Sequence, residues 1–187
     1  MAKQSRPRPD GHGQDLWVFG YGSLMWRPGF VHAERHAAHI HGYHRALCVY
    51  SHIYRGTPER PGLVMGLDRG GSCFGVAFRI APEQREDVRA YLRARELITD
   101  VYREALLPAR LRDGRVVAAL AYVADRRHPQ YAGRLSRDGL LALVRQGHGQ
   151  AGSNADYVRS TYSHLRDLGF DDGLLGWLAA ELGQPGG

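Results

Sequence analysis

An Asp113-Gly114 pair between two long apolar segments constrains the fold of this chain more than any other feature. Residues 102–111 precede the pair and residues 116–124 follow it. An Asp-Gly pair between extended segments is typical of a tight hairpin turn, because the central residues of such a turn adopt positive φ angles. We therefore predict two adjacent antiparallel strands on either side of this pair.

Further extended segments precede the hairpin. Residues 16–21 form an aromatic-rich apolar run that ends in glycines, and residues 35–50 end in a second apolar run. Residues 62–67 and 73–80 continue the pattern of short apolar segments. We expect the glycine pair at 70–71 to turn the chain between these last two segments.

One helix is predicted between these segments and the hairpin. Pro82 suits a first helical turn, and the acidic residues that follow it favour the positive end of the helix dipole. Val88, Leu92 and Glu96 are spaced four residues apart, so they share one face of this helix. A second row, which we expect to be solvated, holds Arg85, Arg89 and Arg93.

Capping residues mark further helices in the last third of the chain. Ser136 is one candidate cap, Ser153 or Asn154 is a second, and a third is Asp171 or Asp172. Strands in the first two thirds and helices at the end predict an α+β fold. We expect a mostly antiparallel, barrel-like sheet with flanking and C-terminal helices.

Length and composition predict a single globular domain. The chain has 187 residues, of which 43% are hydrophobic, enough to bury a continuous core. Residues 1–14 are polar and lack the apolar segment of a signal peptide, so we expect a disordered tail before a domain at 15–187. No apolar run approaches the ~20 residues that span a bilayer, so we expect no membrane partner.

Cysteine usage favours a reducing compartment. Cys48 and Cys73 lie in apolar surroundings and form no CxxC motif, which is typical of packed, reduced thiols. A bridge between the two is the alternative. We expect a cytoplasmic protein without a zinc site, since two isolated cysteines do not supply four ligands.

A formal net charge of +6 raises the possibility of a nucleic-acid-binding module. The arginines are scattered, however, and no predicted helix carries a basic stripe interleaved with aromatic residues. We therefore expect no nucleic-acid partner. A modest positive field also attracts a small anionic substrate.

The glycine-containing segment 20–23 is the first candidate for a functional site. Small residues directly after a strand let the backbone turn sharply and present successive N–H groups, which can bind an anion such as a carboxylate. A plain tight turn is the alternative. A dinucleotide-binding fingerprint is excluded by Met25, and a nucleophile elbow by Tyr21 and Met25, so Ser23 is not expected to be a covalent nucleophile.

Glu96 is the second candidate. It lies on the apolar face of the predicted helix near its C-terminal end, where burial and the negative end of the dipole both disfavour ionisation. A raised pKa is what a general acid or base at neutral pH requires. The alternative is a structural salt bridge to Arg93, Arg95 or Arg103.

Arginine and histidine side chains supply two weaker candidates. Arg55 lies in a polar loop, where it either clamps a carboxylate or decorates the surface. The histidines at 32, 36, 39, 41 and 44 are dense, but their spacing on an extended segment favours surface residues over a metal site.

Taken together, these segments resemble the ChaC-type γ-glutamylcyclotransferases. The segment 18–26, Val-Phe-Gly-Tyr-Gly-Ser-Leu-Met-Trp, is similar to the N-terminal signature of that family. The resemblance continues in family order over nearly all of the chain after the N-terminal tail, through residues 42–45, 55–63, 66–73, 91–96, 123–126, 130–133 and 152–157.

This resemblance implies a small α+β fold around a β-barrel, with no metal and no organic cofactor. It implies glutathione as the substrate, whose γ-glutamyl amine attacks its own γ-carbonyl to give 5-oxoproline and Cys-Gly. Glu96 corresponds to the family's catalytic glutamate. The family's substrate loop corresponds to Val18, Phe19, Gly20, Tyr21, Gly22 and Ser23, with Leu24 adjoining. A related enzyme for other γ-glutamyl amino acids or amines is the nearest alternative.

Overall fold

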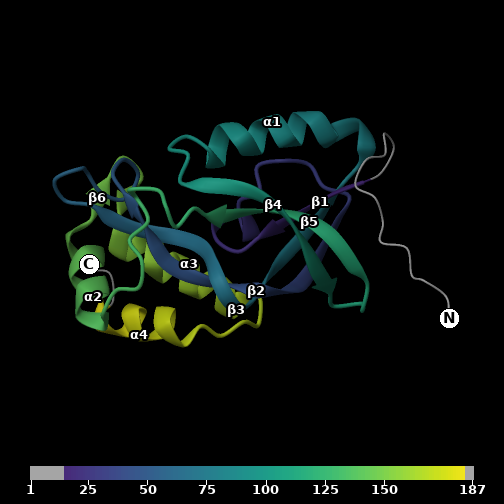
Figure 1. Ribbon diagram of the computed structural model, residues 1–187. Coiled ribbons are helices and arrows are strands. Elements are labelled where there is room, and N and C mark those ends of the chain that lie inside the picture. Colours follow the sequence, from purple (N-terminus) through teal and green to yellow (C-terminus); the bar gives the residue numbers. More distant parts are fainter. Residues whose placement is uncertain (1–14, 184–187) are drawn as a thin grey trace.

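Five strands form a closed barrel in the order β1-β3-β2-β4-β5 in the computed structural model, which describes residues 15–183 (Figure 1). The strands are β1 (Leu16–Gly20), β2 (Glu34–Ser51), β3 (Gly62–Ile80), β4 (Tyr102–Leu111) and β5 (Val116–Ala124). Neighbours in this order pair antiparallel, while β5 closes the barrel through parallel contacts with β1 and β3. The predicted α+β class with a mostly antiparallel barrel is confirmed. The expected disordered tail at 1–14 lies outside the described residues.

The predicted hairpin is confirmed. Strands β4 and β5 pair antiparallel from Tyr102 opposite Ala124 to Arg110 opposite Val116. Gly114 has a φ angle of 94°, which a residue with a side chain rarely adopts. Gly114 therefore fixes the turn for a local steric reason, whereas Asp113 does not adopt a positive φ angle.

The prediction of a turn at Gly70 and Gly71 is wrong. Gly70 and Gly71 both have positive φ angles, but β3 continues through them as one strand. They lie opposite a single residue of β2, between the pairs Tyr43–Arg69 and His41–Ser72. The two glycines therefore form a bulge, because pairing with β2 on both sides keeps the chain extended.

The last three helices of residues 15–183 begin at predicted caps, whereas the first begins later than predicted. The first, α1 (Arg85–Glu96), follows a 3₁₀ turn (Pro82–Gln84), so the α-helix starts three residues later than proline suggests. Ser136 caps α2 (Arg137–Gln146), Ser153 caps α3 (Asn154–Asp167), and Asp172 caps α4 (Gly173–Glu181). A short pair, β6 (His148–Gly149) and β7 (Gly152–Ser153), links α2 to α3.

The helices lie on different sides of the barrel. In Figure 1, α1 runs along β4, whereas α2, α3 and α4 gather around the part of the barrel formed by β2 and β3. Among residues 15–183, no helix combines the length and the apolar character needed to cross a bilayer.

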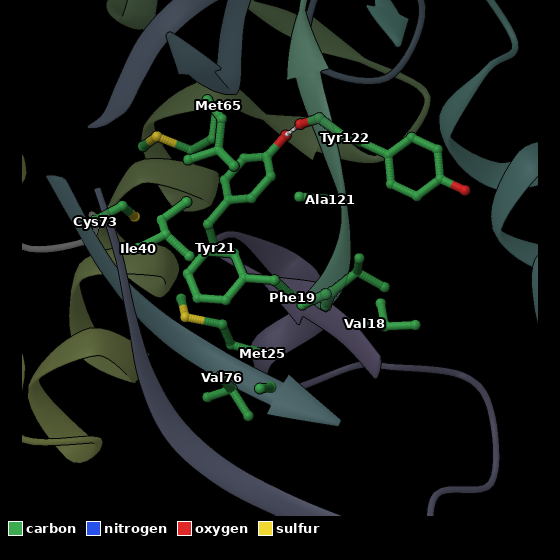
Figure 2. Close-up of a cluster of buried hydrophobic side chains, with 14 of the residues drawn as sticks. Val18, Phe19, Tyr21, Met25, Ile40, Met65, Cys73, Val76, Ala121 and Tyr122 are labelled. Carbon is green, nitrogen blue, oxygen red and sulfur yellow. Dashed lines mark hydrogen bonds between the residues drawn. The ribbon is translucent and has the colours of Figure 1, made fainter. Parts of the chain in front are cut away.

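Strand β1 forms the centre of the core. All five of its residues are buried, and Val18 and Phe19 are completely inaccessible to solvent. Figure 2 shows them packed with side chains from several other strands. A Cβ atom on Gly20 would lie 3.0 Å from the Cβ of Leu24, so glycine at this position allows the chain to fold back tightly after the strand. The core thus fixes the start of the glycine loop.

Candidate active site

A cavity of about 790 Å³ opens where four segments meet. These segments are the loop after β1, the loop after β2, the C-terminal end of α1 with the residues that follow it, and one face of α3, and residues of β3, β4 and β5 complete the wall. The predicted site residues Tyr21, Gly22, Ser23, Leu24, Arg55 and Glu96 all line this cavity. Val18, Phe19 and Gly20 lie in β1 and belong to the buried part of the barrel rather than to the cavity wall.

The glycine loop is held in place by three long-range hydrogen bonds. The Tyr21 hydroxyl donates to the backbone carbonyl of Tyr122 at 2.8 Å, which Figure 2 shows as a dashed line. Arg45 Nε donates to the Tyr21 carbonyl at 2.6 Å, and Arg95 Nη2 donates to Ser23 Oγ at 2.8 Å. Ser23 itself begins a short 3₁₀ turn (Ser23–Met25). The loop is therefore fixed from the barrel interior, from β2 and from α1.

Glu96 is the last residue of α1 and points into the cavity. Val88 and Leu92, on the same helical face, are buried, as the four-residue spacing predicts. The Glu96 side chain is 18% exposed, and Arg95 Nε lies 3.2 Å from its Oε1. Burial raises the pKa of Glu96, while the charge of Arg95 acts in the opposite direction. Burial prevails, so Glu96 takes up and releases a proton more readily near neutral pH than an ordinary carboxylate does.

Three arginines were candidates for a salt bridge to Glu96. In the described part of the chain, one of them, Arg95, forms it. Arg93 instead donates two hydrogen bonds to Glu104, and Arg103 lies 3.5 Å from Asp125. Arg89 also approaches Glu104, at 3.9 Å. Arg93 is solvated, as expected for this row, and it pairs with Glu104 as well, whereas Arg89 is only 29% exposed because it packs toward the same carboxylate of β4.

The tyrosines that line the same cavity as Glu96 include Tyr21, Tyr102, Tyr122 and Tyr157. Burial raises the pKa of each of these four phenols, and the negative charge of Glu96 adds to the effect in every case. Two of them also contact one residue of β3. Tyr102 donates to the Met65 carbonyl at 2.7 Å, and the Tyr157 hydroxyl accepts from the Met65 amide at 3.1 Å.

Sequence reasoning missed Tyr102 and Tyr157 as cavity residues. Tyr157 lies in the segment 152–157 that carries the family resemblance, which is the signal that points to it. Tyr102 opens a strand and carries no comparable signal.

Arg55 lies at the wall of the cavity and ties two loops together. Its Nη1 donates to the carbonyls of Ala151 at 2.6 Å and Ser153 at 3.2 Å, and its guanidinium lies 5.2 Å from the centre of the Tyr157 ring. Cβ atoms on Gly62 or Gly147 would collide with the Arg55 carbonyl, so glycine at both positions permits this close packing. Arg55 is therefore a structural link that also presents positive charge to the cavity.

The histidine-rich segment forms surface contacts. His36 lies 2.9 Å from Glu34, and His39 stacks on Phe74 at 4.1 Å. In the described part of the chain, no group of three or more metal-ligating side chains comes together.

The chain resembles one protein family over almost its whole length. The family model described as "ChaC-like protein" matches residues 16–182. The glutathione-specific γ-glutamylcyclotransferase of Escherichia coli K12 is 38% identical over 160 residues, which cover 85% of this chain and 69% of the relative. The human glutathione-specific γ-glutamylcyclotransferase 1 is 33% identical over 156 residues, covering 81% of this chain and 70% of the relative.

Solved structures share the same fold. The crystal structure of a yeast γ-glutamylcyclotransferase specific to glutathione superimposes with a TM-score of 0.82. The match covers 90% of this chain and 95% of the yeast chain at 23% sequence identity, a level that speaks for the fold alone. The family model and the two relatives decide membership: this chain belongs to the ChaC-like protein family.

Proposed function

We propose that this protein is a γ-glutamylcyclotransferase that cleaves glutathione to 5-oxoproline and Cys-Gly. The observation that carries the proposal is Glu96, a largely buried carboxylate of raised pKa that faces a cavity beside the glycine loop. The printed names of the Escherichia coli and human relatives supply the reaction and the substrate.

Glu96 would move the protons of this reaction. It accepts a proton from the substrate's α-ammonium group, and the free amine then attacks the γ-carbonyl of the same molecule. A new C–N bond closes the five-membered ring, and the attacking nitrogen gives up a second proton as the ring amide forms. The amide bond to cysteine breaks, and Glu96 relays the two protons in turn to the departing nitrogen, which leaves as the ammonium group of Cys-Gly. The atoms balance without water, a covalent enzyme intermediate or a cofactor, because both reacting groups belong to one molecule.

The glycine loop would bind the γ-glutamyl part of the substrate. Backbone N–H groups of Gly22, Ser23 and Leu24 are suited to hold the α-carboxylate or to polarise the reacting carbonyl. Val18, Phe19 and Gly20 act through the buried strand that sets the direction of this loop, and Tyr21 anchors it to β5. Fixing the flexible substrate in its folded shape supplies much of the rate, because cyclisation depends on the orientation of the two ends.

Arg55 would attract the carboxylate at the other end of the substrate. Its Nη1 is engaged by the carbonyls of Ala151 and Ser153, which orients the guanidinium along the cavity wall. An oriented guanidinium binds carboxylates with defined geometry. Glutathione carries such a carboxylate on its glycine, so Arg55 would favour a γ-glutamyl peptide over a γ-glutamylamine.

We also place this reaction in the cytoplasm. Cys48 and Cys73 are both free and buried, and burial raises the pKa of the Cys48 thiol to about 12. Thiols remain reduced where glutathione is the redox buffer, which is also where this substrate is available.

The test is a substrate panel scored by release of 5-oxoproline. Purified protein is incubated with glutathione, with a γ-glutamyl amino acid and with a γ-glutamylamine, and products are identified by mass spectrometry. We expect 5-oxoproline and Cys-Gly from glutathione at the highest kcat/KM. Preference for the γ-glutamyl amino acid or amine would assign the related activity, and no 5-oxoproline from any compound would overturn the proposal.

A further inference from the structure

We infer that Arg95 is a positioning residue that holds the glycine loop and the Glu96 carboxylate in a fixed mutual arrangement. This inference rests on the proposed role of Glu96 as the group that moves protons. Arg95 directly precedes Glu96 at the end of α1, and its side chain is 25% exposed.

One guanidinium bridges the helix and the segment that follows β1. Arg95 Nη2 donates to Ser23 Oγ at 2.8 Å, and Nη1 donates to the carbonyls of Arg27 at 2.8 Å and Pro28 at 3.3 Å. Nη1 also donates to the Tyr91 hydroxyl at 3.0 Å, one turn earlier on α1. The planar fork thus fixes three positions of the loop region from a single helical residue, which the point charge of a lysine cannot reproduce.

The same guanidinium acts on Glu96. Its Nε lies 3.2 Å from Glu96 Oε1, and its charge opposes the effect of burial on the pKa of the carboxyl. The other titratable groups on the cavity wall are six phenols, two further guanidiniums, two imidazoles and one carboxyl: Tyr21, Tyr50, Tyr54, Tyr102, Tyr122, Tyr157, Arg27, Arg55, His52, His164 and Asp156. Arg95 is the cation in ion-pair contact with Glu96, so it keeps Glu96 ionised at a lower pH than burial alone would allow.

Arg93 provides a matched control on the same helix. It lies two residues earlier and is 53% exposed, and its guanidinium donates two hydrogen bonds to Glu104 rather than to the loop. Replacing Arg93 removes one arginine from α1 without touching Ser23 or Glu96. Any effect that is the same for substitutions at Arg93 and at Arg95 is therefore a general effect on the helix.

The experiment compares Arg95→Gln, Arg95→Lys and Arg93→Gln with the unmodified protein. For each we would measure kcat/KM for glutathione across pH, the thermal unfolding midpoint, and the titration of the Glu96 carboxyl by ¹³C NMR of glutamate-labelled protein. Misplacing a reacting group by about 1 Å costs on the order of 10²-fold in rate. We expect Arg95→Gln to lower kcat/KM by that order and to move its acid limb, and the Glu96 titration, to higher pH.

The two other variants separate charge from geometry. Arg95→Lys retains the charge but not the planar fork of the guanidinium. We therefore expect the acid limb of its kcat/KM profile to stay near that of the unmodified protein, while kcat/KM itself is lowered as in Arg95→Gln. Arg93→Gln should leave both the acid limb and kcat unchanged. An unchanged Glu96 titration in Arg95→Gln, or an equal shift in Arg93→Gln, would overturn the inference.

Failure of the proposed function would appear differently. The unmodified protein would then release no 5-oxoproline, while the NMR titration of Glu96 would still report whether Arg95 acts on the carboxyl.

Discussion

Two glutamates on either side of the α1–β4 connection have nearly the same exposed fraction, but their pKa values are shifted in opposite directions. The side chain of Glu96 is 18% exposed and that of Glu104 is 21% exposed. Burial raises the pKa of Glu96. The pKa of Glu104 is lowered, chiefly by its hydrogen bonds from Arg93.

The difference shows that exposed area alone does not decide what such a carboxylate can do, because depth of burial raises the pKa of Glu96 whereas hydrogen bonds lower that of Glu104. Glu104 accepts hydrogen bonds from Arg93 at 2.9 and 3.0 Å and from the Tyr122 hydroxyl at 3.2 Å. Glu96 has one ion-pair contact within the described residues, with Arg95 at 3.2 Å. A carboxylate held by several donors stays ionised and links elements, whereas a less engaged one can exchange protons with a substrate.

The largest expected effect is on turnover in Glu96→Gln. The amide has nearly the shape of the carboxylate but cannot accept the proton of the substrate's ammonium group. We expect kcat/KM for glutathione to fall by about 10²–10⁴-fold, the range that general acid–base catalysis contributes. Full activity in a correctly folded Glu96→Gln protein, checked by circular dichroism, would show that Glu96 does not carry the protons of the reaction.

Glu104→Gln is the matched variant, and its main effect should be on stability. Loss of the charge weakens two hydrogen bonds from Arg93 and one from Tyr122, at a cost of about 1–3 kcal/mol in the free energy of unfolding. Turnover below the unfolding transition should stay close to that of the unmodified protein, because Glu104 does not line the cavity. Chemical denaturation and a glutathione assay measure the two quantities, and a loss of activity comparable to that of Glu96→Gln would show that the roles are not separate.

Arg55→Gln should weaken substrate binding. Without the guanidinium, the glycine carboxylate of glutathione loses a charged partner, and we expect KM to rise about tenfold with a smaller change in kcat. Arg60→Gln is the control, since Arg60 lies exposed in the same loop and outside the cavity wall. Equal KM values for the two variants would contradict the assignment.

The smallest effect concerns Glu34, which resembles Glu104 in having several partners. Hydrogen bonds from Arg115, His36 and Arg79 lower the pKa of Glu34 from its ordinary value of 4.5 to about 2. A carboxyl whose pKa is depressed in the folded state stabilises the protein above its unfolded pKa, and that contribution is lost as the pH falls through the folded value. The denaturation midpoint should therefore depend less on pH between about 5 and about 2 in Glu34→Gln than in the unmodified protein. Identical pH profiles would show that this ion cluster contributes nothing measurable.

Local signals predicted the parts of the fold that local sterics and capping decide. The Asp113-Gly114 hairpin and the caps at Ser136, Ser153 and Asp172 all appear where the sequence places them. The turn expected at Gly70 and Gly71 fails because pairing with β2 outweighs the freedom of two glycines. Propensity yields to tertiary pairing at that point.

The site was predictable to the extent that it depends on periodicity and family resemblance. The four-residue spacing of Val88, Leu92 and Glu96 places the carboxylate on a buried helical face, and the structure has it there. The contacts of Arg45 with Tyr21, and of Tyr157 with Met65, join residues 24 and 92 positions apart. Such contacts arise only when the barrel closes, so no local pattern contains them.

The most direct test of the difference between the two glutamates is to titrate both in one sample. Protein labelled with ¹³C at glutamate side-chain carboxyls would be followed by NMR across acidic and neutral pH, with Glu96→Gln and Glu104→Gln used to assign the two signals. We expect Glu96 to titrate above the ordinary value of 4.5 and Glu104 below it. A Glu96 carboxyl that titrates at or below Glu104 would contradict this expectation.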